Sequence, residues 1–336
     1  MAQYILNMGG EGSDQHVVNT VDVFEVTDSG VTRRTDLNLT LSVARESVAA
    51  ASCGNYILAM GGYDSGTRIN TVDIFQVTAS GVEKVTPSTP LTLSVARSSL
   101  AAASVGNYIL AMGGYGSGLS DAVDIFHVTA SGVEKVTPST PLTLSVARSN
   151  VAAASCGNYI LAMGGYANND VSNTVDVFEV TDTGIVNRTT DFNLTLSSGR
   201  GNLAAASFGN YILAMGGAGG VGNVSNAVDV FEVTDTGIVN RTTDFNLTLS
   251  SGRDNLAAAS VGNYILAMGG RGSGSGGISK VVDVFEVTNS GVVHRTDLNL
   301  TLSVGRYYLA AASCGNFVLA MAGASSDAVD VFQLFE

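Results

Sequence analysis

The chain is built from a sequence unit of roughly 50 residues that recurs along its whole length. A repeat of this period indicates a solenoid, a propeller or an array of small modules, so it constrains the fold more than any other feature of the sequence. One marker of the unit is the string Asn-Tyr-Ile-Leu-Ala-Met-Gly-Gly, which begins at Asn55, Asn107, Asn158, Asn210 and Asn263, with degenerate copies at 3–10 and 316–323. A second marker is Val-Asp-Val/Ile-Phe, with its aspartate at Asp22, Asp73, Asp124, Asp176, Asp229, Asp283 and Asp330.

Each unit contains four short apolar runs, which we call a, b, c and d. In the second unit they span 48–53, 55–60, 71–78 and 82–93, and they are separated by Gly, Ser and Asn. Runs of this length with these boundaries predict β-strands joined by tight turns. Run b is apolar on both faces, which is typical of a strand in stacked sheets. A four-stranded unit repeated in this way predicts an all-β protein, a single β-propeller domain over 1–336.

The units resemble kelch repeats in three places. A double glycine ends run b, an aromatic residue follows an acidic residue in run c, and an arginine precedes run a. Kelch repeats usually carry a tryptophan in strand d, whereas this chain has no tryptophan and places Leu-Thr-Leu there. The resemblance therefore implies a divergent, aliphatic kelch propeller.

The number of blades follows from the first and last units. Runs b and c occur seven times, runs a and d six times, and the chain begins at b and ends at c. Seven blades would leave the first blade without its inner strand and the last without its outer strand. Six blades would place 308–313 in the first blade and leave the final b and c unused. Because the last Val-Asp-Val-Phe, 329–332, keeps the full pattern, we favour seven.

One end of the blades varies more than the other. Successive antiparallel strands place the d–a and b–c connections at one end of a blade and the a–b and c–d turns at the other. The turns hardly differ between units, whereas the b–c loops vary, at 11–19, 63–70, 115–121, 166–173, 218–226 and 271–280. The two residues after each repeated arginine vary as well, and Tyr307-Tyr308 is one such pair. Variation confined to one face predicts a binding surface on a rigid scaffold, although drift of unconstrained loops is the alternative.

The repeated arginines are the sharpest candidate ligand groups. In kelch substrate-adaptor domains, arginines at this place hold acidic peptides, so the resemblance implies an anion site with bidentate geometry. The alternative is that each arginine pairs with an aspartate of strand c, such as Asp73 or Asp124, and locks neighbouring blades; the shared periodicity favours it. The candidate ligand-binding residues are Arg45, Arg97, Arg148, Arg200, Arg253, Arg306, Tyr307 and Tyr308.

Composition narrows the possible partners. With 29 acidic and 16 basic residues the net charge is −13, which argues against nucleic-acid binding and against docking on an anionic membrane. The three cysteines share one apolar slot of the repeat, and no Cys/His spacing suits zinc, so we expect no metal and no cofactor. The first residues lack the charged and apolar regions of a signal peptide, so we expect synthesis in the cytoplasm.

These observations predict a non-catalytic binding module whose variable face meets a protein, an acidic peptide or a glycan. The alternative is a structural, self-assembling protein, a surface or virion component, that associates through its terminal strands. An enzyme would need a polar cluster unique to one unit, and the sequence offers none.

Overall fold

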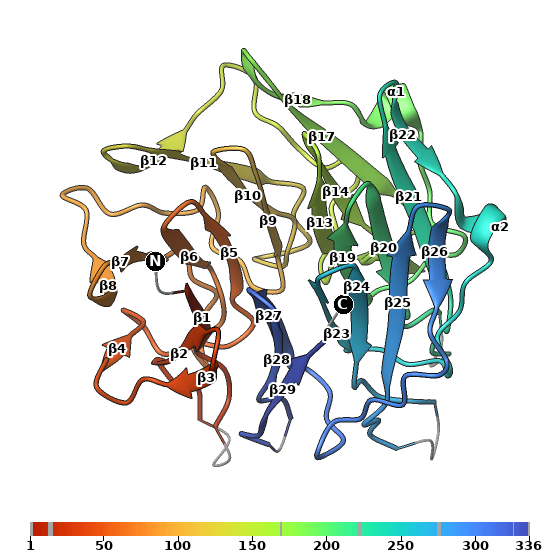
Figure 1. Cartoon of the computed structure of the whole chain (residues 1–336). Helices are drawn as coiled ribbons and strands as arrows, with labels where there is room; N and C mark the ends of the chain where they lie inside the picture. Colours follow the sequence, from red (N-terminus) through yellow and green to blue (C-terminus); the bar gives the residue numbers. More distant parts are fainter. Residues whose placement is uncertain are drawn as a thin grey trace. The chain divides into compact units, whose positions relative to one another are not determined.

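The computed structural model describes residues 3–334 except 13–15, 169, 221–222, 274–276 and 325 (Figure 1). Most of the missing positions belong to the variable b–c loops, so those parts of the predicted binding surface lie outside the described residues. The chain groups into two compact units, residues 1–151 with 180–186 and residues 152–179 with 187–336, and each is described by itself.

The repeat unit folds as predicted into a four-stranded antiparallel sheet, as the second unit illustrates. Strand β5 (Ala49–Cys53) pairs with β6 (Tyr56–Met60), β6 with β7 (Val72–Thr78), and β7 with β8 (Gly81–Val85). The β5–β6 hairpin is closed by Gly54, whose φ of +58° lies in the left-handed region that glycine adopts without a steric penalty. The sequence-predicted runs a to d correspond to these strands.

The same four strands recur along the chain, and we number the sheets as blades 1 to 7 (Figure 1). The a strands are β5, β9 (Ala101–Val105), β13 (Ala152–Cys156), β19 (Ala204–Phe208), β23 (Ala257–Val261) and β27 (Ala310–Cys314). The b strands are β1 (Gln3–Met8), β6, β10 (Tyr108–Met112), β14 (Tyr159–Met163), β20 (Tyr211–Met215), β24 (Tyr264–Met268) and β28 (Phe317–Met321). The c strands are β2 (Thr20–Thr27), β7, β11 (Val123–Thr129), β17 (Val175–Thr181), β21 (Val228–Thr234), β25 (Val282–Thr288) and β29 (Val329–Gln333). The d strands are β3 (Gly30–Arg33), β8, β12 (Gly132–Val136), β18 (Gly184–Asn187), β22 (Gly237–Asn240) and β26 (Gly291–His294).

A few short elements complete the secondary structure. Strand β4 (Leu39–Thr40) pairs with β2, and β15 (Tyr166–Ala167) pairs with β16 (Asp170–Val171) inside a b–c loop. Two one-turn helices, α1 (Thr189–Phe192) and α2 (Thr242–Phe245), follow the d strands of blades 4 and 5. Within the described ranges, no helix is both long and apolar enough to cross a membrane.

The seven-blade arrangement is confirmed, and the six-blade alternative is wrong. Strand β27 pairs with β28, so the last a strand belongs to the last blade and not to the first. Among the described residues, the first sheet comprises β1, β2, β3 and β4 without an a strand, and the last comprises β27, β28 and β29 without a d strand. The protein is therefore an all-β propeller of seven blades.

The core lies between successive sheets, because each b strand is covered on both faces. In blade 5, Val228 and Val230 of strand c pack with Ile265 and Ala267 of the next b strand. The leucine that stands near the usual kelch tryptophan is buried in each blade that has a d strand, so aliphatic side chains fill that space: Leu41, Leu93, Leu144, Leu196, Leu249 and Leu302.

The double glycine after strand b is required by close packing. Gly113 has a φ of +65°, and a Cβ at this position would lie 2.7 Å from the backbone oxygen of Arg148. A side chain would therefore force apart strand b and the connection that leads into the next blade. This connection carries the repeated arginine, so the two sequence markers are neighbours in space.

Candidate binding face

The repeated arginines lie inside the protein. The Arg97 side chain is fully buried; its Nη2 donates to Asp124 Oδ2 at 2.8 Å and to the Ala111 carbonyl at 3.1 Å. Burial alone would raise the pKa of Asp124, but the hydrogen bond from Lys135 and the charge of Arg97 outweigh it and lower that pKa. Asp124 also accepts from the backbone N–H of Ser94, at 2.8 Å. The ion pair therefore fastens the incoming connection to strand c of its blade.

The same pair recurs in other blades. The Arg–Asp distances are 2.8 Å for Arg45–Asp73, 2.5 Å for Arg253–Asp283 and 2.6 Å for Arg306–Asp330, and Arg200 pairs with Asp229 in the same way. All six arginines, Arg148 included, have no exposed surface. The guanidiniums therefore do not lie at the surface, contrary to the anion-site hypothesis. Because solvent does not reach them, they are not open to an acidic peptide. The observed geometry is that of the alternative hypothesis, in which the arginine pairs with an aspartate of strand c.

The residues directly after the arginine do reach the predicted face. Backbone bridges join Glu46 to Tyr63 in blade 2, Ser98 to Tyr115 in blade 3, and Asp254 to Arg271 in blade 6. Each bridge links a d–a connection to the start of a b–c loop. The prediction that these two connections share one end of the blade is therefore confirmed. We call this end, formed by the two residues after each arginine and by the b–c loops, the loop face.

The second residue after each arginine is held in a left-handed conformation. Its φ is between 51° and 55° in every copy, and its side chain is Ser or Asn in five of them: Ser47, Ser99, Asn150, Asn202 and Asn255. Backbone hydrogen bonds join successive copies, from Asn150 N–H to the Ser99 oxygen at 2.9 Å and from Tyr308 N–H to the Asn255 oxygen at 3.0 Å. Sequence reasoning missed this constraint, although the run of Ser and Asn was a signal for it, since Asn tolerates this region.

Tyr308 is the exception in that slot. A bulky residue with φ of 55° is strained, yet the Tyr308 side chain is turned outward and 63% exposed. Its ring lies against Tyr307, with a centroid distance of 5.0 Å. Strain maintained at an exposed aromatic residue points to a role in binding rather than in folding. The structure therefore keeps Tyr307 and Tyr308, and not the arginines, as candidate ligand contacts.

Arg271 of blade 6 lies beside Tyr307. Its guanidinium lies 5.6 Å from the Tyr307 ring centroid and donates to Asp254 Oδ2 at 3.2 Å, while half of the Arg271 side chain stays exposed. Asp254 is buried, and its Oδ1 has no hydrogen-bond partner. Burial, followed by the charge of Asp254, raises the pKa of Tyr166, which accepts a hydrogen bond from Asn202.

Blades 2 and 3 carry a comparable cluster at their own loop-face end. The Arg68 guanidinium lies 5.2 Å from the Tyr63 ring centroid and 4.9 Å from that of Tyr115. Beside them, burial and the charge of Glu11 raise the pKa of Glu46. Arginine stacked on tyrosine is favourable by cation–π attraction. Sequence analysis identified these loops as variable but did not single out Tyr63, Arg68, Tyr115 or Arg271.

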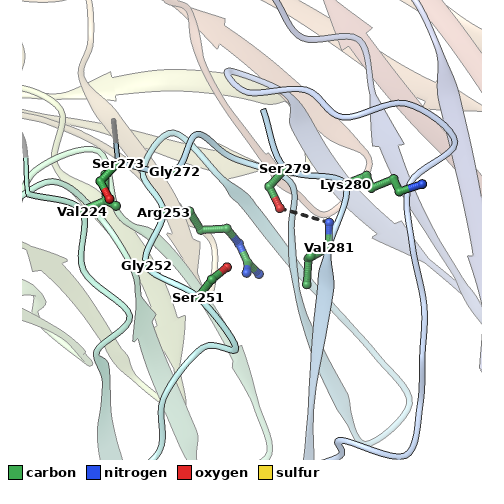
Figure 2. A pocket seen from close by; sticks show the side chains of 9 residues that line it. All are labelled: Val224, Ser251, Gly252, Arg253, Gly272, Ser273, Ser279, Lys280 and Val281. Atoms are coloured by element: carbon green, nitrogen blue, oxygen red, sulfur yellow. Dashed lines mark hydrogen bonds between the residues drawn. The ribbon is translucent and has the colours of Figure 1, made fainter. Parts of the chain in front are cut away.

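A pocket of about 480 Å³ opens in blade 6 (Figure 2). Its wall includes Arg253, Ser251, Ser279 and Lys280. Figure 2 shows the Ser279 hydroxyl hydrogen-bonded to the backbone of Val281, at 3.1 Å, and the Lys280 side chain directed away from Arg253. The Arg253 charge is already matched by Asp283, so the pocket presents no free cation from this residue. In the part of the chain that the structure covers, no three His, Cys, Asp or Glu residues gather in a way that could hold a metal ion.

Comparison with known proteins bears on the fold. A family model described as the kelch motif matches residues 44–79 and 147–182, each spanning a repeated arginine and strands a to c. No curated protein sequence matches the chain. A solved structure titled "Structure of YjhT" superposes with a TM-score of 0.61 at 12% identity, covering 87% of this chain and 94% of that one. Seven sheets with kelch sequence markers, two motif matches and this structural likeness identify the chain as a kelch-repeat β-propeller.

Proposed function

We propose that this protein is a non-catalytic interaction module that binds a partner protein through the loop face. The kelch propeller is generally a protein-interaction module, which supports the class of function. The observation that carries the proposal is the position of the tyrosines. Six of the eleven occupy the repeated first slots of strand b, and the other five all lie on the loop face: Tyr63, Tyr115, Tyr166, Tyr307 and Tyr308.

The chemistry of this face suits a protein partner. Tyrosine, tryptophan and arginine are enriched among the few residues that supply most of the energy in protein interfaces. Tyrosine also buries a large area with little loss of side-chain freedom. Arg68 and Arg271, the arginines of the b–c loops, are both stacked on these tyrosines. The two Tyr–Arg clusters therefore offer side chains of the types that anchor protein–protein interfaces.

An acidic peptide is a weaker candidate than a folded protein surface. The six repeated arginines are buried, and Arg271 is already paired with Asp254. The net charge of −13 adds a long-range repulsion toward acidic partners. A glycan would be held by the same tyrosine rings, so the test includes it as a distinct outcome.

The test is photo-crosslinking from the loop face in an extract of the source cells. A photoreactive residue at position 308 should capture a partner protein, and Tyr307→Ala with Arg271→Ala should abolish this capture. The matched control is Phe208→Ala, which removes an exposed aromatic residue at the opposite, a–b end of a blade. Capture that is indifferent to the loop-face changes, or lost equally in the control, would refute the proposal. Capture of a glycan alone would refute the assignment to a protein.

A further inference from the structure

Two buried polar atoms on the loop face lack a hydrogen-bond partner. They are Asp254 Oδ1 and Asn255 Nδ2, in the two residues that follow Arg253. Asp254 is 2% and Asn255 7% exposed, and within the part of the chain that the structure describes neither atom is bonded. A buried donor or acceptor that stays unpaired costs free energy. An open acceptor and an open donor in adjacent residues therefore point to a ligand that completes both.

A tyrosine from blade 4 lies next to these two residues. The Tyr166 ring packs over Gly201, since a Cβ on that glycine would lie 2.5 Å from the ring. The Tyr166 oxygen accepts from Asn202 Nδ2 at 3.2 Å. Burial and then the charge of Asp254 raise the pKa of Tyr166, so the hydroxyl lies within electrostatic range of that carboxylate. The other copies of the Gly201 slot carry a side chain, so the room for the tyrosine ring comes from this glycine: Glu46, Ser98, Ser149, Asp254 and Tyr307.

The charge of Asp254 is already balanced. Arg271 donates to Asp254 Oδ2 at 3.2 Å, which leaves Oδ1 as the open acceptor. A second cation at Oδ1 would make the site positive and would leave the Asn255 amide without an acceptor, whereas an anion would face the carboxylate. A neutral group with a donor and an acceptor side by side satisfies both open atoms. A primary carboxamide is such a group, because its NH₂ donates and its oxygen accepts.

The site is covered by side chains that are themselves exposed. Arg271, which bonds to Asp254, is half exposed, and Tyr308 is 63% exposed. Exposed side chains change rotamer within nanoseconds, so the carboxylate is uncovered without a change in the backbone. The repeated arginines differ in this respect, because they donate to the backbone of strand b inside the blade, as Arg253 does to Ala267.

We propose that the site formed by Tyr166, Asp254 and Asn255 binds the carboxamide of a glutamine or asparagine side chain of the partner protein. This inference rests on the proposed function, because it names the group of the partner that the loop face recognises. The carboxamide NH₂ donates to Asp254 Oδ1, and its oxygen accepts from Asn255 Nδ2. Tyr308 N–H donates to the Asn255 oxygen at 3.0 Å, so the exposed Tyr308 ring stands beside the site and packs on the methylene groups of the incoming side chain.

The first test titrates the full chain with N-acetylglutamine methylamide and follows the side-chain amide signal of Asn255 by ¹H–¹⁵N NMR. The signal is assigned by its loss in Asn255→Ser, and we expect it to shift saturably. The matching glutamate, lysine and serine compounds should each bind about tenfold more weakly, because each leaves one open atom unpaired or opposes a charge. No shift with the glutamine compound, equal binding of all four, or tighter binding of the lysine or serine compound would overturn the proposal.

The repeat itself supplies matched variants. Serine already occupies the slot of Asp254 at Ser98 and the slot of Asn255 at Ser99, so Asp254→Ser and Asn255→Ser should keep the melting temperature, which circular dichroism checks. Each variant should bind the glutamine compound about tenfold more weakly in saturation-transfer NMR. Asn150→Ser makes the same change in the same slot elsewhere and should leave binding unchanged. Wild-type binding in both serine variants, or an equal loss in the control, would refute the site.

Photo-crosslinking separates this inference from the proposed function. Asp254→Ser should also weaken capture of the partner protein at position 308. If capture is normal while the glutamine compound does not bind, the partner still uses the loop face and only the carboxamide assignment fails. If the compound binds as expected but no protein is captured, the proposed function fails, and the assignment to a protein side chain is overturned in favour of a free carboxamide.

Discussion

Arg97 and Arg271 make the same chemical pair in opposite surroundings. Each guanidinium donates to an aspartate, Asp124 at 2.8 Å and Asp254 at 3.2 Å. Arg97 recurs in the same slot of six units and has no exposed surface, whereas Arg271 occurs once and is half exposed. In this protein the recurring charged residues are buried inside the blades, whereas Arg271, which departs from the repeat, is exposed on the loop face.

The largest expected effect comes from opening the buried pair. Asp124→Ala leaves the Arg97 charge buried without its carboxylate, so the free energy of unfolding should fall by about 3–5 kcal/mol. Urea denaturation followed by circular dichroism measures it. The double variant Arg97→Met with Asp124→Leu removes both charges and should recover much of the loss. A loss below about 1 kcal/mol in the single variant would contradict a structural role for the pair.

Acid should weaken the buried pairs next. Burial alone would raise the pKa of Asp283, but its hydrogen bond with His294 and the charge of Arg253 lower it from 3.8 to about 2. Because the folded-state pKa is the lower one, ionised Asp283 stabilises the protein above about pH 4, and this stabilisation is lost as the pH falls toward 2. The contribution is about 2 kcal/mol. Stability measured from pH 5 to 2 should fall less steeply in Asp283→Asn than in the wild type; parallel curves would refute the assignment.

On the loop face, relieving strain should raise stability. Tyr308→Asn installs the residue that Asn150, Asn202 and Asn255 already place in this slot, where φ is positive. We expect the free energy of unfolding to rise by about 1 kcal/mol, since Asn adopts this conformation more readily than Tyr. Calorimetric melting checks the gain, and crosslinking from position 166 should weaken in the same variant. A protein that is both less stable and fully competent for binding would contradict a binding role for Tyr308.

The smallest effect should come from the Arg271–Asp254 pair, whose arginine is half exposed. Asp254→Ala leaves Arg271 solvated, and it also removes the buried Oδ1 that has no partner, so stability should change by less than about 1 kcal/mol. The same urea assay compares it directly with Asp124→Ala. A loss as large as that of Asp124→Ala would mean that the two ion pairs stabilise the fold equally, which would contradict the difference proposed between them.

Much of the fold could be read from the sequence because it rests on local patterns. Short apolar runs, with glycine at the turns, predicted the four strands of the unit, and the copies of Val-Asp-Val-Phe predicted seven blades. The site was harder to predict. A repeated arginine has the same pattern whether it faces water or a carboxylate, so the sequence left Arg97 with two interpretations. The positive φ of Asn255 and the contact between Arg68 and Tyr115 arise from packing between adjacent blades, which no single unit contains.

The sequence by itself determined the strand order within a blade and the blade count, because each depends only on which runs are present. Tertiary structure alone decided which charged groups are buried and which tyrosines lie on the loop face. The physical reason is that exposure is set by the neighbouring sheet. Asn202 and Asn255 occupy the same slot of the repeat, and only the segment packed against each one distinguishes a half-buried residue from a buried one.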